Sequence, residues 1–225
     1  MSDTAKRMAA LAAVELVQHG MCLGIGTGST AEHFINLLGE RVRSGLSVTG
    51  IATSERSAAM CRRLGIALTS LDETPVLDLA VDGTDEFDGG LNLLKGGGGA
   101  LLREKIVAAA AKRFVVIADG SKQVDVLGAF PLPIEIIPMA RIPISRRVAD
   151  LGATVALRQN AAGTPFQTDE GHWILDCAFG PKISAPEALA KDLSAWPGVV
   201  EHGLFCGMAE RVLVASGGQV TAIMG

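Results

Sequence analysis

Short apolar runs alternate with segments of helical periodicity in the first half of this chain. The apolar runs of strand length lie at residues 21–25, 47–52, 76–81 and 114–118. The segments with apolar side chains at helical spacing lie at residues 4–18, 30–38, 54–64 and 100–112. Parallel strands need a crossover connection, usually a helix, between one strand and the next. The alternation therefore predicts an α/β fold with a parallel sheet covered by helices on both faces.

Local signals predict where these helices begin and end. Gly20 and Gly65 follow the last apolar positions of the first and third helical segments, and glycine commonly ends a helix. Ser29 and Glu32, three residues apart, form a capping-box pattern. The pattern predicts that the second helix begins at about Thr30.

The order of elements changes after Phe130, where the stretch Pro131-Leu132-Pro133 interrupts the chain. The next expected elements are strands at 134–137, 154–157, 172–177 and 199–204, with helices at 142–151 and 186–196. This β-α-β-β-α-β order is typical of a ferredoxin-like unit. Residues 211–215 and 220–224 add two short strands. We therefore expect a Rossmann-like parallel-sheet domain of residues 1–130 plus about 205–225, and a smaller ferredoxin-like α+β domain of residues 131–204.

Composition and charge exclude several classes of protein. Glycine is 27 of 225 residues, about 12%, but 48% of the chain is hydrophobic, which argues against disorder. The net charge of −4 leaves no basic excess for nucleic acid or a membrane surface. No apolar run reaches the ~20 residues of a membrane span, and no signal-peptide pattern is present. Four scattered cysteines and four scattered histidines suggest buried free thiols in a reducing cytoplasm and no metal site.

A glycine-rich loop at residues 24–30 (GIGTGST) lies between an expected strand and an expected helix. Glycines let the backbone approach an anion, and the start of a helix offers unpaired N–H groups. The hydroxyls of Thr27, Ser29 and Thr30 could add donors. Ser29 replaces the third glycine of the dinucleotide fingerprint, and no lysine completes a P-loop. We expect an anion site, most simply for phosphate; the alternative is a tight turn without a ligand.

Four acidic residues follow another expected strand within seven residues: Asp82, Asp85, Glu86 and Asp88. In an open parallel sheet, ligands bind outside the carboxyl ends of the strands. The acids could therefore face a ligand. A solvated acidic turn or a magnesium loop are the alternatives at this point.

Lys95 precedes four consecutive glycines, residues 96–99, and Glu104 follows them on an expected helix. Four glycines together are costly in chain entropy and form a second backbone nest for an anion. A helix would mount the Glu104 carboxylate rigidly. The alternative is that Glu104 is a helix-face acid paired with Lys105 or Lys112.

The loop at residues 118–122 (ADGSK) again follows a strand, and Lys122 could counter the charge of a phosphate or remain a solvated surface lysine. One sheet edge would then present a glycine-hydroxyl loop, an acidic loop, a lysine-glycine loop and a second lysine. This convergence predicts a site for a small phosphorylated, polyhydroxylated molecule.

Taken together, these segments resemble the type A family of ribose-5-phosphate isomerases. The matching stretches are residues 24–30 (GIGTGST), 81–88 (VDGTDEFD), 95–105 (KGGGGALLREK), 118–122 (ADGSK), 131–140 (PLPIEIIPMA) and 197–205 (PGVVEHGLF). The resemblance runs in consistent order from about residue 6 towards the C-terminus. It implies an aldose-ketose isomerase that interconverts D-ribose 5-phosphate and D-ribulose 5-phosphate through an enediolate without a cofactor, in the non-oxidative pentose phosphate pathway.

The resemblance also implies roles for individual residues. Glu104 occupies the position of the base that moves a proton between C2 and C1, and Lys95 with the glycine amides would stabilise the developing oxyanion. Asp82 and Asp85 match paired acids that bind sugar hydroxyls, Asp82 also acting in ring opening. The predicted catalytic residues are Glu104, Asp82, Asp85 and Lys95. The predicted substrate-binding residues are Lys6, Thr27, Gly28, Ser29, Thr30, Asp82, Gly83, Thr84, Asp85, Lys95, Gly96, Gly97, Gly98 and Lys122.

Several rival functions remain at this point. An aminosugar-phosphate isomerase-deaminase should use a histidine, but only His33 lies near the four loops in the sequence. A coenzyme A transferase would need a glutamate nucleophile, which Glu104 could supply. A phosphosugar sensor would need a DNA-binding segment, for which we expect no room before Met21, and the failed fingerprint disfavours a nicotinamide dehydrogenase. We expect a cytoplasmic homodimer, or a tetramer, that acts on a small phosphosugar and binds neither nucleic acid nor membrane.

Overall fold

The structure is a computed structural model that describes residues 3–225, and it divides into two compact units. The first unit contains the described residues up to Thr84, together with Arg103–Gln123 and Gly207–Gly225. The second unit contains Asp85–Leu102 and Val124–Cys206. The chain thus passes between the units four times.

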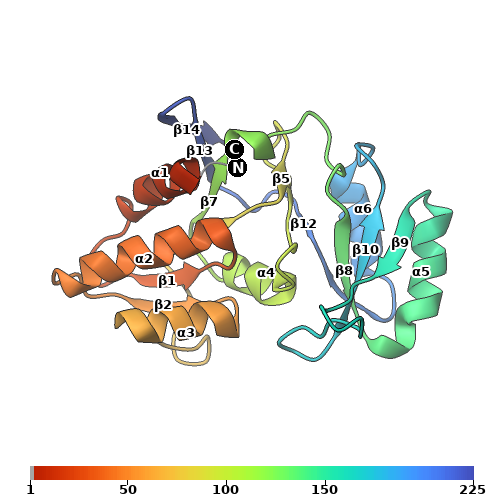
Figure 1. Cartoon of the computed structure of the whole chain (residues 1–225), viewed down its shortest axis with the longest axis horizontal. Helices are drawn as coiled ribbons and strands as arrows, with labels where there is room; N and C mark the ends of the chain where they lie inside the picture. Colours follow the sequence, from red (N-terminus) through yellow and green to blue (C-terminus); the bar gives the residue numbers. More distant parts are fainter. Residues whose placement is uncertain (1–2) are drawn as a thin grey trace. The chain divides into compact units, whose positions relative to one another are not determined.

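The first unit is built on a seven-stranded sheet (Figure 1). Its strands, in spatial order, are β14 (Gln219–Met224), β13 (Arg211–Ser216), β7 (Phe114–Asp119), β4 (Leu79–Gly83), β1 (Cys22–Ile25), β2 (Thr49–Ala52) and β3 (Ala67–Leu68). Neighbouring strands are parallel except for the β13–β14 hairpin. The predicted parallel sheet is therefore confirmed, and the two C-terminal strands join it beside β7.

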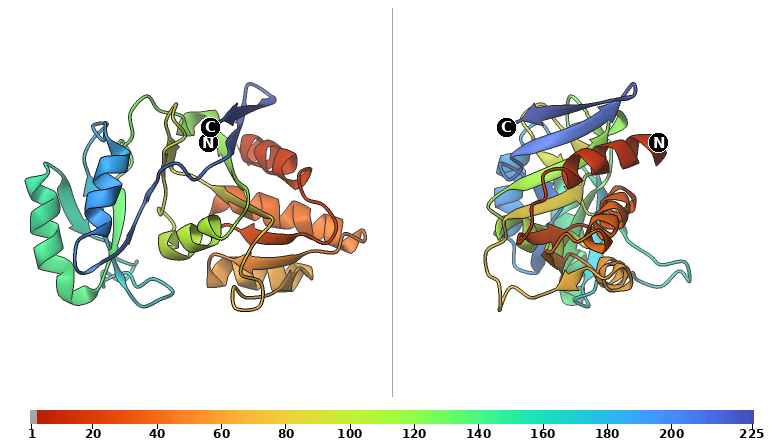
Figure 2. Two further views of the ribbon diagram at one scale, coloured as in Figure 1. Left: turned by 180° about the vertical axis from the view of Figure 1, so that it is seen from behind. Right: turned by 90° about the vertical axis from the view of Figure 1, so that its left-hand side faces the viewer.

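Helices cover both faces of this sheet. They are α1 (Asp3–Val14), α2 (Ser29–Arg43), α3 (Glu55–Leu64) and α4 (Leu101–Ala109), the last beginning at the boundary of the units. Alternate strand residues such as Leu23, Ile25 and Val81 join a buried cluster with α1 and α2. On the opposite face, a Cβ on Gly24 would lie 2.5 Å from the Val107 side chain of α4. Figure 2 shows α1 beside the β13–β14 hairpin, which it also contacts.

Two details of the predicted helices were wrong. The first helix ends at Val14 and not near residue 18, because Leu16 and Val17 donate to carbonyls three residues back, and the Arg41 guanidinium donates to the Val14 carbonyl at 2.7 Å. The predicted capping box is also absent. Gly28, at φ 108°, caps α2 without a side-chain hydrogen bond, so the helix begins at Ser29.

The second unit contains the predicted ferredoxin-like arrangement. Its elements in chain order are β8 (Leu132–Ile136), α5 (Arg141–Asp150), β9 (Thr154–Leu157), β10 (Trp173–Ala178), α6 (Pro186–Ser194) and β11 (Val199–His202). The antiparallel sheet has the order β11-β8-β10-β9. Its core includes Ile134, Leu175 and Leu193. The predicted fold class is therefore confirmed.

A small antiparallel sheet in the second unit was not predicted. It consists of β5 (Glu86–Phe87), β6 (Leu93–Leu94) and β12 (Leu204–Phe205). Short 3-10 helices lie at η1 (Gly120–Lys122) and η2 (Pro138–Ala140). Since β5 and β6 pack with β12, residues 85–102 group with the second unit, whereas the sequence analysis placed them in the first domain. The domain boundaries at 130/131 and about 204/205 stay a prediction.

Across residues 3–225, none of the helices combines the length and apolar character needed to cross a membrane.

Candidate active site

The loops that follow four neighbouring strands meet at one edge of the seven-stranded sheet. Ile25, the last residue of β1, pairs with Ala52 at the end of β2 and with Val81 of β4. Gly83, at the end of β4, pairs with Ile117 of β7. The strands are parallel, so their carboxyl ends lie together, where ligands of open α/β sheets bind.

Asp82 is bound to the glycine-rich loop by its carboxylate. Its Oδ1 accepts hydrogen bonds from the backbone N–H of Thr27 at 3.1 Å and of Gly83 at 2.7 Å. A Cβ on Gly26 would lie 2.1 Å from the same Oδ1, so only glycine fits at this position. The side chain of Asp82 is 3% exposed. The loop and the carboxylate therefore position one another.

A cluster of hydroxyl side chains binds the glycine-rich loop, residues 24–30, through Thr27 and Gly26. The Thr27 hydroxyl lies 2.7 Å from that of Thr53, 2.8 Å from that of Ser54 and 3.1 Å from that of Ser57. The Ser57 hydroxyl donates to the Gly26 carbonyl at 2.8 Å. These three supporting residues were not predicted, because their only local signal in the sequence is the N-cap of α3, where Ser54 accepts from the Ser57 amide.

The N-terminus of α2 lies beside a lysine from α1. The helix begins at Ser29 directly after Gly28, so the first N–H groups of residues 29–31 have no intrahelical partner. The Lys6 ammonium donates to the Ser29 hydroxyl at 2.8 Å. A helix N-terminus with an adjacent cation favours an anion. Lys122, in η1, forms no ion pair with any carboxylate among residues 3–225.

Glu104 and Asp82 line the same narrow crevice of the first unit, together with Gly24, Gly26 and Thr53. Both carboxylates are buried, Glu104 being 5% exposed. The crevice is too narrow to admit a water molecule, so its lining residues pack closely around the two carboxylates.

Glu104 lies near the N-terminus of α4. The residue lies in the first turn, where the dipole of the helix favours a negative charge. Lys112, one of the partners considered above, is paired with Asp78 at 2.9 Å.

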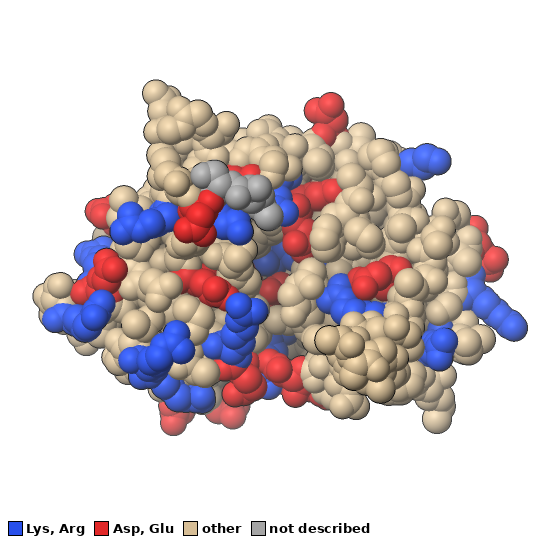
Figure 3. All heavy atoms as spheres, viewed as in Figure 1, with Lys and Arg blue, Asp and Glu red and all other residues tan. Residues whose placement is uncertain are grey.

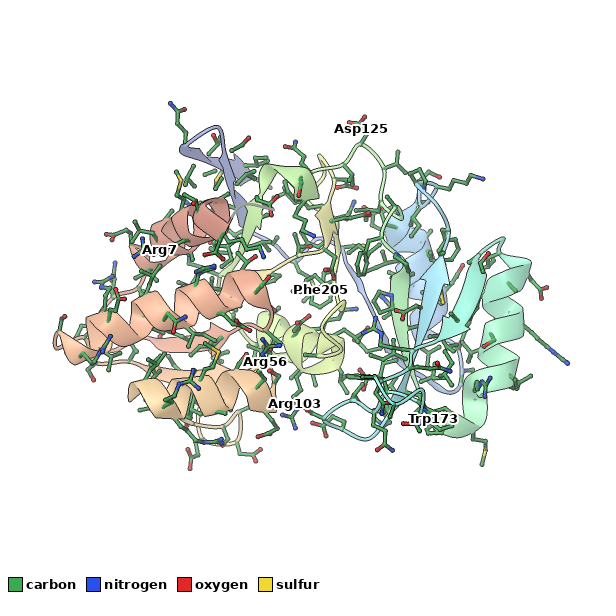
Figure 4. All side chains as sticks on the ribbon, viewed as in Figure 1. Arg7, Arg56, Arg103, Asp125, Trp173 and Phe205 are labelled. Atoms are coloured by element: carbon green, nitrogen blue, oxygen red, sulfur yellow. The ribbon has the colours of Figure 1, made fainter. Side chains whose placement is uncertain are left out.

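Charges of both signs are interspersed over the helices of the first unit. Figure 3 shows this on the face that carries α2 and α3. Arg103 pairs with Glu55 at 3.0 Å and Arg56 pairs with Glu32; Figure 4 labels both arginines. These two arginines therefore already have anionic partners within the protein.

The second unit contains Asp85 and the run of four glycines. The Asp85 Oδ2 accepts a hydrogen bond from the Gly97 amide at 2.8 Å. Gly96 and Gly99 adopt left-handed φ values of 105° and 81°, which allow the backbone to turn sharply. Asp85 therefore fixes the glycine run, as Asp82 fixes the first glycine loop.

Lys95 is buried and lies next to β12. Its ammonium lies 5.4 Å from the centre of the Phe205 ring, which Figure 4 shows on that strand. Its amide donates to the Gly203 carbonyl at 2.8 Å, and a Cβ on Gly203 would lie 2.2 Å from the Lys95 carbonyl oxygen. Sequence reasoning did not single out Gly203 or Phe205, although both lie within the stretch 197–205 that matched the family.

The other two acids of the acidic loop have structural partners. Glu86 accepts from the amides of Gly128, at 2.7 Å, and Phe130. Asp88 accepts from the amides of Gly90 and Asn92 within a turn. In the described part of the chain, no three His, Cys, Asp or Glu side chains are grouped as metal ligands.

Comparisons with known proteins agree on one family. Residues 49–219 match the sequence profile of ribose 5-phosphate isomerase A (phosphoriboisomerase A). The chain is 57% identical to the ribose-5-phosphate isomerase A of Sinorhizobium fredii over 216 residues, which are 93% of each protein. It is 54% identical to that of Methylorubrum extorquens over 225 residues, which are 97% of this chain and 95% of the relative.

Solved structures are similar over the whole chain. The ribose 5-phosphate isomerase A of Methanocaldococcus jannaschii has a TM-score of 0.95 at 39% identity, with both chains fully covered. A D-ribose-5-phosphate isomerase in complex with phospho-erythronic acid has a TM-score of 0.97 at 37% identity, again with both chains fully covered.

Proposed function

The chain belongs to the ribose 5-phosphate isomerase A family, and we infer from this that it interconverts D-ribose 5-phosphate and D-ribulose 5-phosphate. The reaction is an aldose-ketose isomerisation of the pentose phosphate pathway through an enediolate. It is internally balanced, because the hydrogen that leaves C2 is replaced at C1 and the carbonyl moves from C1 to C2.

Glu104 is the base in this proposal. It takes the C2 proton of the open-chain aldose, and the electron pair of that bond forms the enediolate as negative charge develops on O1. The proton then returns to C1 while the O2 proton passes to O1. One carboxylate on a rigid helix can reach both carbons, and its burial beside Asp82 limits its solvation.

The other predicted residues bind the sugar and its charges. Asp82 and Asp85 accept hydrogen bonds from sugar hydroxyls, and Asp82 assists ring opening. Lys95, with the glycine amides, stabilises the negative oxygen of the enediolate. The burial of Lys95 supports this role, because a positive charge acts more strongly on a nearby negative charge where water is excluded. Thr27, Gly83 and Thr84 also bind the substrate in this proposal.

The phosphate is bound at the N-terminus of α2 in this proposal. Gly28, Ser29 and Thr30 supply N–H and hydroxyl groups there. Lys6 and Lys122 supply positive charge, and the Lys6–Ser29 hydrogen bond supports the first of these. The bound phospho-erythronic acid of the similar solved structure is also a phosphorylated sugar derivative.

The observation that carries the catalytic assignment is the pair of buried carboxylates that line one crevice: Asp82, near the carboxyl end of β4, and Glu104, in the first turn of α4. NMR of ribose 5-phosphate in D₂O tests the function, because isomerisation produces ribulose 5-phosphate and exchanges hydrogen for deuterium at carbon. Absence of the ketose would contradict it.

The Glu104→Gln variant tests the base. It should fold and bind the phosphosugar, but kcat should fall by about 10²- to 10⁴-fold because the amide cannot accept the proton. Glu40→Gln, on the exposed side of α2, is the matched control and should keep wild-type kcat. Turnover at the wild-type rate in Glu104→Gln would remove Glu104 from this role.

Assembly and location are also part of the proposal. We place the enzyme in the cytoplasm as a homodimer, with a tetramer as the alternative. Large apolar side chains that are exposed near the start of α5 support assembly: Ile137, Ile142 and Met139, which is 92% exposed.

A further inference from the structure

Arg158 lies directly after β9, and its guanidinium is fixed by a carboxylate of the neighbouring strand β10. Its Nε donates to the Asp176 Oδ2 at 3.0 Å, and its Nη2 pairs with the Asp176 Oδ1. The side chains are 13% and 27% exposed. Two parallel bonds between a guanidinium and a carboxylate set the orientation of the guanidinium as well as its place.

The third nitrogen of this guanidinium is directed at the run of four glycines. The Nη1 of Arg158 donates to the Gly96 carbonyl at 3.0 Å and to the Gly97 carbonyl at 3.3 Å. Arg158 is separated from Gly96 by 62 residues in the sequence, so the contact is a product of the tertiary structure.

These contacts, with the hydrogen bond from the Gly99 amide to the Gly96 carbonyl at 3.0 Å, orient the peptides of the glycine run. The described peptide bonds are all trans, so the C=O and the following N–H of each peptide point in opposite directions. In the Gly96–Gly97 peptide, the carbonyl faces Arg158 and the N–H binds Asp85. In the Gly97–Gly98 peptide, the carbonyl also faces Arg158. The N–H of Gly98 therefore points away from Arg158, and no acceptor binds it within residues 3–225.

An aromatic side chain supports the same loop. A Cβ on Gly99 would lie 2.6 Å from the Phe166 ring, and the guanidinium of Arg158 lies 5.9 Å from the centre of that ring. The Phe166 amide donates to the Arg158 carbonyl at 2.9 Å. Arg158 and Phe166 thus pack together against the glycine run.

We propose that Arg158 is a positioning residue for the isomerisation: anchored by Asp176, it holds the Gly96 and Gly97 carbonyls so that the Gly98 amide is presented to the oxyanion of the enediolate. The inference rests on the proposed function. A donor that is fixed before the reaction stabilises developing charge without reorganising, whereas a mobile glycine loop would have to order itself each time.

The contacts of Arg158 require an arginine and could not be made by a lysine. A lysine has one ammonium group and cannot bind both Asp176 oxygens while donating to two carbonyls. The Arg158→Lys variant should therefore keep the positive charge and lose the orientation of the loop.

The test compares Arg158→Lys and Arg158→Gly with the wild-type enzyme. We expect kcat to fall about 10- to 100-fold in both variants, with KM for ribose 5-phosphate changed less than about 3-fold. Phospho-erythronic acid carries a carboxylate that an oxyanion donor would bind, so its inhibition constant should rise. Guanidinium ion added to Arg158→Gly should restore part of kcat, which a purely structural effect on stability would not produce.

Arg113→Lys is the matched control, because Arg113 forms a similar two-bond pair with Glu210 in the first unit. It should keep wild-type kcat and inhibition. Wild-type kcat in Arg158→Lys, or equal losses in Arg113→Lys, would overturn the inference. If Arg158→Gly does not fold, Asp176→Asn is the second variant and should show the same separation of kcat from KM.

Amide NMR tests the positioning role of Arg158 without an activity measurement. The resonances of Gly96, Gly97 and Gly98 should shift in Arg158→Lys and not in Arg113→Lys. Unchanged resonances would overturn the positioning role even in an active enzyme. An inactive wild-type enzyme would instead contradict the proposed function. The glycine resonances would still show whether Arg158 orients the glycine run.

Discussion

Replacing Gly26 with Ala should displace the Asp82 carboxylate from the edge of the sheet. The added Cβ would lie 2.1 Å from the Asp82 Oδ1 and 2.7 Å from its Cα, so the backbone itself blocks a simple side-chain rotation. Asp82 accepts two backbone hydrogen bonds, from Thr27 and Gly83. Hydrogen bonds to charged groups contribute roughly 1.5–3 kcal/mol each, so losing one or both costs roughly 1.5–6 kcal/mol.

The loss should appear in both stability and turnover. For a chain of this length, each kcal/mol lowers Tm by about 2–4 °C, so Gly26→Ala should melt about 3–24 °C below wild type. A misplacement of about 1 Å in a catalytic group costs about 100-fold in rate, and kcat should fall accordingly. Calorimetry and a coupled assay of ribulose 5-phosphate measure the two effects.

Gly89→Ala is the matched control for the loss of a glycine. It is exposed, no atom lies within 4 Å of its added Cβ, and its φ is outside the left-handed region. Its Tm and kcat should equal or slightly exceed those of wild type. If Gly26→Ala keeps wild-type Tm and kcat, the close contact with Asp82 does not restrict this position and the reasoning fails.

Two further predictions concern groups outside the crevice. Burial raises the pKa of Glu135, so the folded protein binds the carboxyl proton more tightly than the unfolded chain does. The folded state therefore loses stability as the pH rises through the pKa of Glu135 in the folded protein. The Glu135→Gln variant should therefore have a higher free energy of unfolding than wild type at pH 8. The difference should fade towards pH ~4, where the carboxyl of the unfolded chain is also protonated. Urea titrations at several pH values measure the free energy of unfolding of both proteins, and a difference that does not change with pH would refute the prediction. Burial also raises the pKa of Cys61 to about 11 and of Cys177 to about 12, so iodoacetamide at pH 8 should modify the more exposed Cys206 first and reach the other two only on unfolding. Mass spectrometry of the labelled peptides reads this out, and equal labelling in the folded enzyme would contradict it.

Much of the fold could be predicted because its signals are local. The strand predicted at 154–157 is β9 without change, and Gly65 ends α3 at a left-handed φ of 76°. The strands β5 and β6 could not be predicted in this way, since each has two residues and no periodicity. The capping box failed because the conformation of Gly28 started the helix one residue earlier, while the Ser29 hydroxyl binds Lys6 instead.

The candidate site shows the same division. The glycine runs, the acids and Glu104 were all identifiable, because unusual residue types in unbroken order are visible without coordinates. Their supports were not. Thr53 and Ser57 are ordinary hydroxyl residues in the sequence, and they become recognisable only where they surround the Thr27 side chain.

By itself, the sequence determined the chemistry that is available here: flexible backbone at two glycine runs, carboxylates after a strand and on a helix, and a family that uses them for isomerisation. The tertiary structure decided which groups meet. The Thr27 amide binds Asp82 across 55 residues, and Arg158 reaches Gly96 across 62. The reason is physical: backbone conformation depends on near neighbours in the chain, whereas a contact between distant segments depends on strand order and register, which the whole sheet sets at once.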